Sequence, residues 1–364
     1  MKIGILTFHC AHNYGAVLQC YALQEFLKHM GHDVEVIDYR PKYLITPYKR
    51  LVIHRFISLN PIKFLKNTIK ETLLINRRFR RYMAFDKFIT NRLNLSERVT
   101  ANNIPLKYDI YIMGSDQIWN PKITKGFDSI YWGQFKFPKE RRKYIAYAAS
   151  METKSINEEE LVFYKKLLEN FNAVSVREFQ LASLLQPLTD KKIETVLDPT
   201  LLADSSIWNK IAKQPSIEQK YVLIYQIRSN QNTSRIAKKI AQQLNAVVIE
   251  VVAWLNIHFE RNQFQEASPE EFLGLIKYSS CIVTTSFHGT VFSVIFNRPF
   301  YCIKLDDGSD TRSMSLLKNT GLEERMINKD DNPIFSEVDY TVANKILINM
   351  RNNSRNFLLN AIGR

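Results

Sequence analysis

His288 and Gly289 interrupt an apolar stretch at a point where a strand would give way to a helix. Residues 281–284 are apolar or β-branched, as in a strand buried on both faces, and residues 290–296 have a helical apolar pattern. In an α/β sheet, ligands bind at the carboxyl ends of the strands. An imidazole there, beside the free N–H groups of a starting helix, suits proton transfer next to a bound anion. The simpler role for this histidine is to cap the turn.

Arg177 is a second candidate, because it ends another apolar run and precedes a helix that starts near Glu178. A guanidinium held at a strand end suits a carboxylate or a phosphate. Its alternative role is an ion pair with Glu178 or Asp198 that braces the loops. Asp116 follows a third strand, where it could accept a hydroxyl proton as a general base or cap a turn.

Lys304 and Arg312 flank the acidic turn 306–310, directly after the last strand expected in the second half of the chain. Cations in a mobile loop near His288 could close over an anionic ligand. The alternative is local pairing with the aspartates of the same turn.

Asn13, Tyr14 and Gly15 form a turn like those that hold phosphate groups, but the glycine spacing of a dinucleotide site is missing. His9 and His12 have the HxxH spacing, yet the turn offers too few further ligands for a metal. We therefore expect no metal site.

The hydrophobic pattern predicts the elements that position these residues. A strand over 2–8, a helix over 16–30 and a strand over 33–38 form a βαβ opening, which implies a parallel sheet with a right-handed crossover. Further strands are predicted over 108–113, 143–148, 173–176, 194–197, 221–227, 246–252, 281–284 and 299–303. Helices are predicted over 157–170 and 232–244, and another follows the capping box of Ser268 and Glu271.

At 364 residues the chain is long enough for two domains. Residues 203–219 are polar and mostly without periodicity, so we place the junction there. The predicted fold is α/β with two Rossmann-like lobes, 1–205 and 206–364. The last apolar run, 342–359, is expected to be a helix that packs back on the first lobe.

The net charge of +14 is concentrated in residues 41–100, where fourteen Lys or Arg side chains stand against three acids, a net charge of +11. These cations alternate with apolar residues at helical spacing, which predicts a basic helical insertion. Such helices bind anionic lipid or a polyanionic substrate, or only keep a protein soluble. No nucleic-acid-binding motif accompanies the charge.

Four cysteines without a CxxC pair favour a reducing, cytoplasmic compartment. No segment approaches the roughly 20 apolar residues of a membrane span, and the N-terminus lacks the features of a signal peptide. We expect a cytoplasmic protein whose basic segment would contact the inner face of the cell membrane.

Several motifs, in order along the chain, resemble the polysaccharide pyruvyl transferase family. They are residues 4–7 with 13–19, 114–120, 175–178, 197–202, 286–293, and Arg312 with 316–322. The resemblance implies a fold similar to GT-B glycosyltransferases and transfer of pyruvate from phosphoenolpyruvate to a sugar as a ketal. It implies phosphoenolpyruvate as co-substrate, no cofactor, and Arg177 and His288 as the residues most tied to activity.

One position departs from the family pattern, because many members have an arginine where this chain has Ser286. We expect Arg312 or Lys304 to replace it in binding the donor, beside Ser286 and Gly289. Residues expected to contact the acceptor, a lipid- or nucleotide-linked sugar, are Asn13, Tyr14, Gly15, Ser115 and Gln117. Two alternatives stay open: a nucleotide-sugar glycosyltransferase, and a non-catalytic protein that binds polysaccharide or membrane during assembly.

Overall fold

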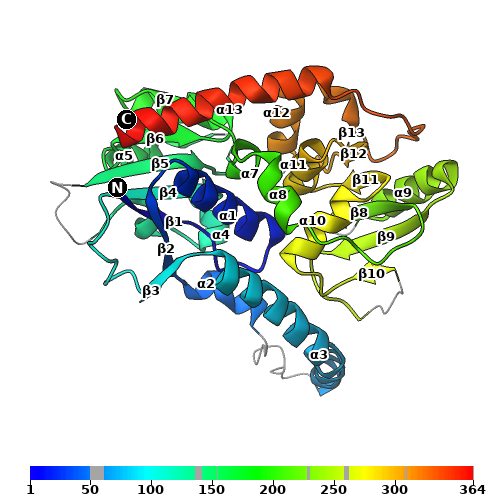
Figure 1. Cartoon of the computed structure of the whole chain (residues 1–364). Helices are drawn as coiled ribbons and strands as arrows, with labels where there is room; N and C mark the ends of the chain where they lie inside the picture. The colour runs from blue at the N-terminus through cyan, green and yellow to red at the C-terminus, as the bar shows by residue number, and fades with distance from the viewer. Residues whose placement is uncertain are drawn as a thin grey trace.

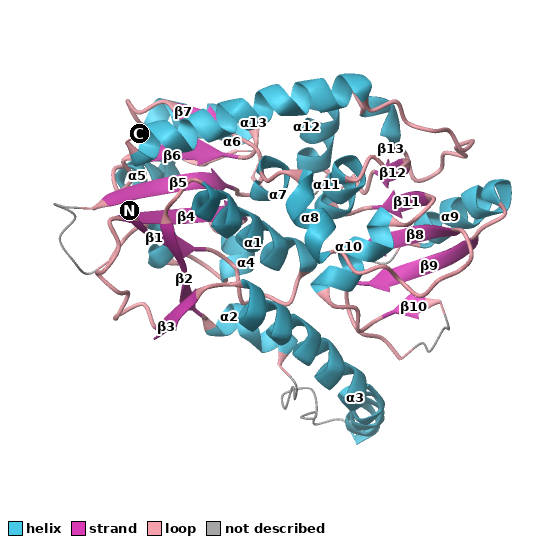
Figure 2. Cartoon of the chain, in the orientation of Figure 1, coloured by secondary structure: helices cyan, strands magenta, loops and turns pink. Residues whose placement is uncertain are grey.

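The computed structural model describes residues 1–49, 61–135, 142–153, 155–227, 230–257, 262–306, 308 and 310–363. It contains two parallel β-sheets, one from each half of the chain, with helices packed against both (Figures 1 and 2). The strands are apolar and mostly buried, as expected when helices cover both faces of a parallel sheet.

The first sheet has the order β3-β2-β1-β4-β5-β6-β7, and its strand pairs are parallel. Its strands are β1 (Lys2–Leu6), β2 (Asp33–Tyr39), β3 (Leu95–Val99), β4 (Ile110–Asp116), β5 (Lys143–Ala149), β6 (Ala173–Val176) and β7 (Ile193–Thr195). The strand order reverses between β1 and β4. The carboxyl ends of these strands therefore border the crevice where such sheets bind ligands.

The second sheet repeats the pattern with the order β10-β9-β8-β11-β12-β13, again with parallel pairs. Its strands are β8 (Tyr221–Gln226), β9 (Val247–Val252), β10 (Gln263–Phe264), β11 (Cys281–Thr284), β12 (Phe300–Ile303) and β13 (Met326–Ile327). The reversal here lies between β8 and β11. Two sheets with this order confirm the prediction of an α/β fold with two Rossmann-like lobes.

The crossover helices cover both sheets. The longer ones are α1 (Tyr14–His29), α3 (Pro61–Arg92), α5 (Glu158–Leu168), α9 (Gln231–Leu244), α10 (Pro269–Lys277), α11 (Phe287–Ile295), α12 (Thr311–Thr320) and α13 (Thr341–Ile362). The shorter ones are α2 (Lys42–Ile45), α4 (Pro121–Thr124), α6 (Phe179–Leu185), α7 (Pro199–Leu202) and α8 (Ser205–Ile211). The predicted capping box starts α10, since Ser268 and Glu271 exchange side-chain-to-backbone hydrogen bonds.

The basic insertion ends earlier than predicted. We expected it over 41–100, but α3 stops at Arg92 and residues 95–99 form β3, an edge strand parallel to β2. The cations at 50 and 55 lie outside the described residues. No helix in the described part of the chain is both long and apolar enough to cross a membrane.

One hydrophobic core runs through both lobes. It contains apolar side chains from β1 and α1 of the first lobe together with others from β8, α10 and α11 of the second. Helix α13 starts in the second lobe and crosses back over the first, as Figure 1 shows. There the Phe357 ring packs on Tyr147, and the Ser354 hydroxyl accepts a hydrogen bond from the backbone N–H of Leu197.

Candidate functional site

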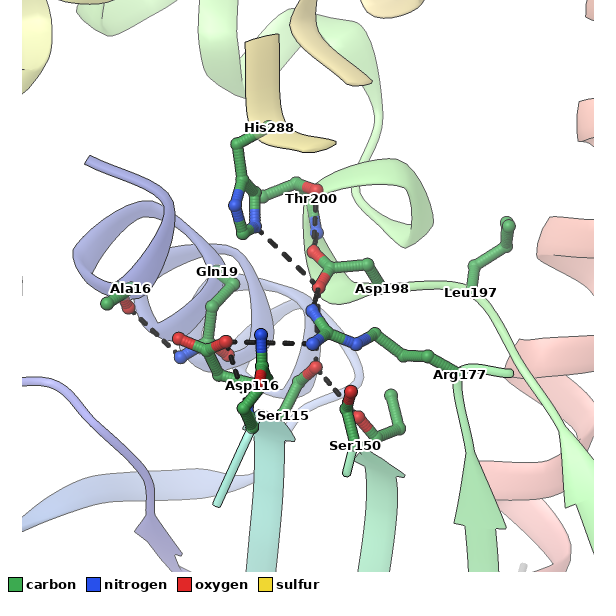
Figure 3. A network of polar contacts seen from close by, with 12 residues as sticks. Ala16, Gln19, Ser115, Asp116, Ser150, Arg177, Leu197, Asp198, Thr200 and His288 are labelled. Carbon is green, nitrogen blue, oxygen red and sulfur yellow. Dashed lines mark hydrogen bonds and ion pairs between the residues drawn. The ribbon is translucent and has the colours of Figure 1, made fainter. Parts of the chain in front are cut away.

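His288 and Arg177 approach the same carboxylate from different lobes. His288 lies in the first turn of α11, directly after β11, while Arg177 follows β6. Arg177 Nη1 donates a 2.7 Å hydrogen bond to Asp198 Oδ2, and His288 Nε2 lies 3.9 Å from the same oxygen. Figure 3 shows the guanidinium between the Asp116 and Asp198 carboxylates, with His288 reaching in from the second lobe.

Asp198 is held rigidly because it caps the N-terminus of α7. Its Oδ1 accepts hydrogen bonds from the backbone N–H of Thr200 at 3.0 Å and from the Thr200 hydroxyl at 2.6 Å. Burial alone would raise the pKa of Asp198, but Arg177 and His288 outweigh it and hold the pKa below its usual range. From the sequence, Asp198 was expected as a possible ion-pair partner of Arg177, and it lies three residues after the end of β7.

Arg177 makes the structural ion pair that was its alternative role, and it also keeps donors to spare. Its Nη2 lies 3.6 Å from Asp116 Oδ1 and its Nε lies 3.7 Å from Glu178 Oε1. Both nitrogens are buried and make no hydrogen bond to any described residue. An anionic ligand could accept hydrogen bonds from these two nitrogens.

Arg312 is the second guanidinium at the site. The guanidinium carbons of Arg177 and Arg312 lie 5.3 and 5.5 Å from the centre of the Phe287 ring. With the Gln117 amide oxygen turned toward it, Arg312 donates two hydrogen bonds of 2.9 and 3.1 Å. Burial and then the neighbouring Arg177 lower the pKa of Arg312, so the pair of cations favours a bound anion.

Lys304 is not part of this arrangement. Its backbone N–H donates to Ile327 O, and Lys304 is not among the described residues that line the cavity beside Arg177 and Arg312. Of the two cations expected to bind the donor, the structure brings only Arg312 to the site.

A cavity of about 290 Å³ adjoins the two guanidinium groups. It is lined by Arg177, Glu178, Phe179, Thr195, Val196, Leu197, Asp198, Leu201, Phe287, Arg312, Ser315, Leu316, Asn319, Met350, Asn353 and Ser354. Burial raises the pKa of Glu178, which weakens the negative charge on this wall. The size and the paired cations suit a small organic anion.

The His288 ring sits tightly against the first lobe. A Cβ atom added to Gly15 would overlap the ring, so this position in α1 admits only glycine without displacing the histidine. Burial lowers the pKa of His288, and although Asp198 and Asp116 oppose this, the net shift is downward. The imidazole is therefore neutral at pH 7 in the free protein. Its Nε2 is buried and has no hydrogen-bond partner among the described residues.

The predicted phosphate-binding turn at residues 13–15 is not a loop. Asn13 caps α1 by accepting a hydrogen bond from Ala16 N at 3.3 Å, and Tyr14 and Gly15 are already helical. Tyr14 is buried, stacks on Phe272 at 4.3 Å, and donates from its hydroxyl to Ala267 O at 2.8 Å. These residues join the lobes, and Tyr14 has no surface left for an acceptor.

At the carboxyl end of β4, Ser115 is buried whereas Asp116 is partly accessible. Ser115 is fully buried and donates to Ala148 O, so it supports the loop instead of facing a ligand. Asp116 has a φ of 76° and is partly accessible, with Oδ1 accepting a 2.8 Å hydrogen bond from Gln117 N. The Asp116 carboxylate thus bonds within its own turn and also faces Arg177 Nη2 at 3.6 Å, while its role as a general base stays a prediction.

The two histidines of the HxxH pair point into different surroundings. His9 Nε2 lies 2.9 Å from Asp38 Oδ1, whereas His12 stacks on Phe85 at 5.2 Å. Within the described ranges no group of three or more His, Cys, Asp or Glu side chains is arranged to hold a metal.

A family model described as Polysaccharide pyruvyl transferase matches residues 13–307. No curated protein matches the chain. Similar solved structures include a putative UDP-N-acetylglucosamine 2-epimerase from Listeria monocytogenes (12% identity, 95% of this chain and 94% of that one, TM-score 0.43). Others are the S. aureus MnaA–UDP co-structure (10% identity, 100% and 98%, TM-score 0.44) and the spinosyn rhamnosyltransferase SpnG (10%, 100% and 92%, TM-score 0.39).

Proposed function

The chain belongs to the polysaccharide pyruvyl transferase family, and from this membership we propose that it transfers pyruvate from phosphoenolpyruvate to two hydroxyls of a sugar, as a ketal. One observation carries the proposal. The buried guanidinium of Arg177 from the first lobe and the partly buried one of Arg312 from the second flank the Phe287 ring beside a cavity. His288 of the second lobe lies across Asp198 from Arg177. This geometry matches a small anion that must also receive a proton.

In this proposal the donor occupies the cavity beside Arg177 and Arg312. Arg312 and the two Arg177 nitrogens that lack a hydrogen bond neutralise the carboxylate and the phosphate. The start of α11 adds Ser286 and the backbone N–H of Gly289, which the Ser286 hydroxyl now contacts at 3.5 Å. A bond this long exchanges readily for one to a ligand.

His288 then supplies the proton. It is neutral in the free protein because burial lowers its pKa, and the negative charges of a bound donor raise that pKa again. The protonated imidazole gives its proton to the methylene carbon of the enol, which leaves oxocarbenium character on the neighbouring carbon. The Asp198 carboxylate, already ionised, stabilises the imidazolium form.

Two hydroxyl additions complete the reaction. The first sugar oxygen bonds to the electron-poor carbon, and Asp116 accepts its proton. Asp116 then releases this proton to water and His288 takes one up, which restores both side chains. The second oxygen bonds to the same carbon while the carbon–oxygen bond to phosphate breaks. Its proton leaves with the phosphate, so atoms and charges balance.

We further propose that the acceptor is a lipid- or nucleotide-linked sugar and that α3 contacts an anionic membrane from the cytoplasmic side. Exposed apolar side chains on α3 support membrane contact: Ile62, Phe64, Leu65, Ile69, Leu73, Ile75, Phe79 and Met83. Exposed Lys66 and Lys70 on the same helix would attract anionic lipid. In flotation with anionic vesicles at low salt, the protein should rise with the lipid; protein that stays at the bottom contradicts the contact.

Mass spectrometry tests the reaction. Incubation with phosphoenolpyruvate and candidate sugar acceptors should give a pyruvylated sugar and free phosphate. Thermal unfolding separates the alternatives, because a bound ligand raises the melting temperature. Stabilisation by nucleoside diphosphates but not by phosphoenolpyruvate would indicate a glycosyltransferase. Stabilisation by neither, with no product, would indicate a non-catalytic assembly protein.

A further inference from the structure

A second cavity, of about 400 Å³, lies where the basic insertion meets the second lobe. It is lined by His12, Pro47, Tyr48, Lys49, Asn67, Lys70, Glu71, Arg78, Arg81, Tyr82, Ala253, Trp254 and Leu255. These residues come from the segments after β1 and β2, from α3, and from the chain that follows β9. The cavity is thus built by both lobes and the insertion together.

The wall of this cavity carries excess positive charge. Glu71 is the only acid among the described lining residues, and it is bound by Arg78 at 2.5 Å. Arg81 faces no carboxylate among the described residues, because its guanidinium donates to three backbone carbonyls at 2.8–2.9 Å. Lys49 and Lys70 have no ion pair with any described residue, and both are exposed. The cavity therefore favours an anion.

An aromatic surface lies beside these cations. The rings of Tyr48 and Trp254 stack with centres 5.5 Å apart and planes 7° apart, and Trp254 is 48% exposed. A flat aromatic face next to cations suits a ligand that joins a phosphate to a sugar ring or a base.

The cavity also lies next to the candidate site. His12 lines it, and only three residues further along, Gly15 packs against the His288 ring. Tyr48 is also close enough to Asp116 for that carboxylate to contribute to the raised pKa of the phenol, after the larger effect of burial. The second cavity is distinct from the one proposed for the donor, because the two share no described lining residue.

We propose that this second cavity binds the phosphate group through which the acceptor sugar is carried, with Lys49, Lys70 and Arg81 neutralising it. The sugar then lies along the Tyr48–Trp254 surface with its hydroxyls toward Asp116. This inference rests on the proposed function. The carrier is a nucleoside diphosphate or a polyprenyl diphosphate, which share the diphosphate that the cations recognise.

Calorimetric titration of the full chain tests the proposal with four probes: inorganic pyrophosphate, uridine diphosphate, farnesyl diphosphate and phosphoenolpyruvate. The variant Lys49→Gln/Lys70→Gln changes two exposed side chains and should fold. We expect it to weaken pyrophosphate binding by about tenfold or more and to leave phosphoenolpyruvate binding unchanged. The matched control Lys165→Gln/Lys166→Gln removes the same charge from exposed positions of α5 outside the cavity. It should bind all four probes normally.

Further outcomes identify the carrier of the sugar and show whether the cavity assignment or the proposed function is wrong. Tighter binding of uridine diphosphate or of farnesyl diphosphate than of pyrophosphate identifies the carrier, and Trp254→Ala should reduce only that gain. Equal weakening by the control, or displacement of pyrophosphate by phosphoenolpyruvate in the wild type, would overturn the cavity assignment. If binding follows Lys49 and Lys70 but no pyruvylated product forms with any acceptor, the cavity proposal holds and the proposed function fails.

Discussion

At the scale of single residues, Asp198 connects the two groups most suited to chemistry. Its Oδ2 accepts a hydrogen bond from Arg177 and lies 3.9 Å from His288 Nε2, so one carboxylate fixes a guanidinium and faces an imidazole. A ligand that neutralises Arg177 would change the balance of charge around the histidine. Binding and proton transfer are therefore coupled through one side chain.

The replacement His288→Gln should lower kcat by about 10²–10⁴, because the amide cannot supply the proton. Phosphoenolpyruvate binding should change little, since the cations proposed to hold it remain. Phosphate release and calorimetric titration measure the two effects. His29→Gln, on the exposed end of α1, is the control and should keep full activity. A His288→Gln enzyme that retains most of its activity and an unchanged circular dichroism spectrum would contradict the proposed role.

The free energy of unfolding should decrease as the pH is lowered, and part of this decrease should depend on His288. Burial lowers its pKa below 6.5, with Asp198 and Asp116 opposing the shift and Arg177 and Arg312 adding to it. Below pH 6.5 the unfolded chain binds a proton that the native protein does not, so the free energy of unfolding decreases as pH falls. This loss amounts to at most about 1.4 kcal/mol per pH unit.

Urea unfolding of the wild type and of His288→Gln at pH 7.5 and 5.5 measures this loss. The wild type should lose more stability between the two pH values than the variant. Equal losses would show that the imidazole is not held neutral by its surroundings.

The sequence predicted part of this site and missed part of it. His288 follows a strand of the second sheet, so its approach to Arg177 depends on how the lobes pack. Arg177 and Asp116 lie at the carboxyl ends of strands in the first sheet, and such ends gather at one edge, so their meeting was predictable. The roles of Tyr14 and Gly15 were not, because both depend on where the second lobe sits. A glycine that makes room for a ring 273 positions away leaves no local pattern.

At the scale of elements, α3 behaves as a brace between the lobes. Arg80 binds Glu266 of the second lobe with hydrogen bonds of 2.5 and 2.9 Å, and Arg92 lies 3.5 Å from Glu270. Arg81 donates to backbone carbonyls of the second lobe. Part of the positive charge of the insertion therefore serves contacts within the molecule instead of an external partner.

Replacing Arg81 with methionine should lower the free energy of unfolding by about 2–4 kcal/mol, because three carbonyls lose their donor while the apolar stem is kept. Chemical denaturation monitored by tryptophan fluorescence measures this. Lys87→Met is the control, since Lys87 is exposed on the same helix. A similar loss in both variants would mean that Arg81 is not a specific brace.

Most strands were predictable because they are continuous apolar runs bounded by polar turns. The strand β3 was not, since its sequence Leu-Ser-Glu-Arg-Val lacks such a run. An edge strand packs on few neighbours, so its pairing with β2 depends on the position of β2 more than on its own residues. Because β3 was not recognised as a strand, the basic insertion was predicted to extend to residue 100.

At the scale of the whole molecule, the two sheets do not make two independent units. Side chains from both lobes belong to one core, and α13 links the second lobe to the first. Scanning calorimetry should therefore show one cooperative transition, with calorimetric and van't Hoff enthalpies close to each other. Two resolved transitions would show that the lobes unfold separately and that the shared core contributes little.

Helix α13 also has a consequence for how the chain is synthesised. The ribosome releases the first lobe before the second, yet the surface around Tyr147 and Leu197 is covered only by residues near the end of the chain. The half that is translated first is therefore completed last. Until then it exposes apolar surface, and this is the stage of biosynthesis at which we expect chaperones to be most needed.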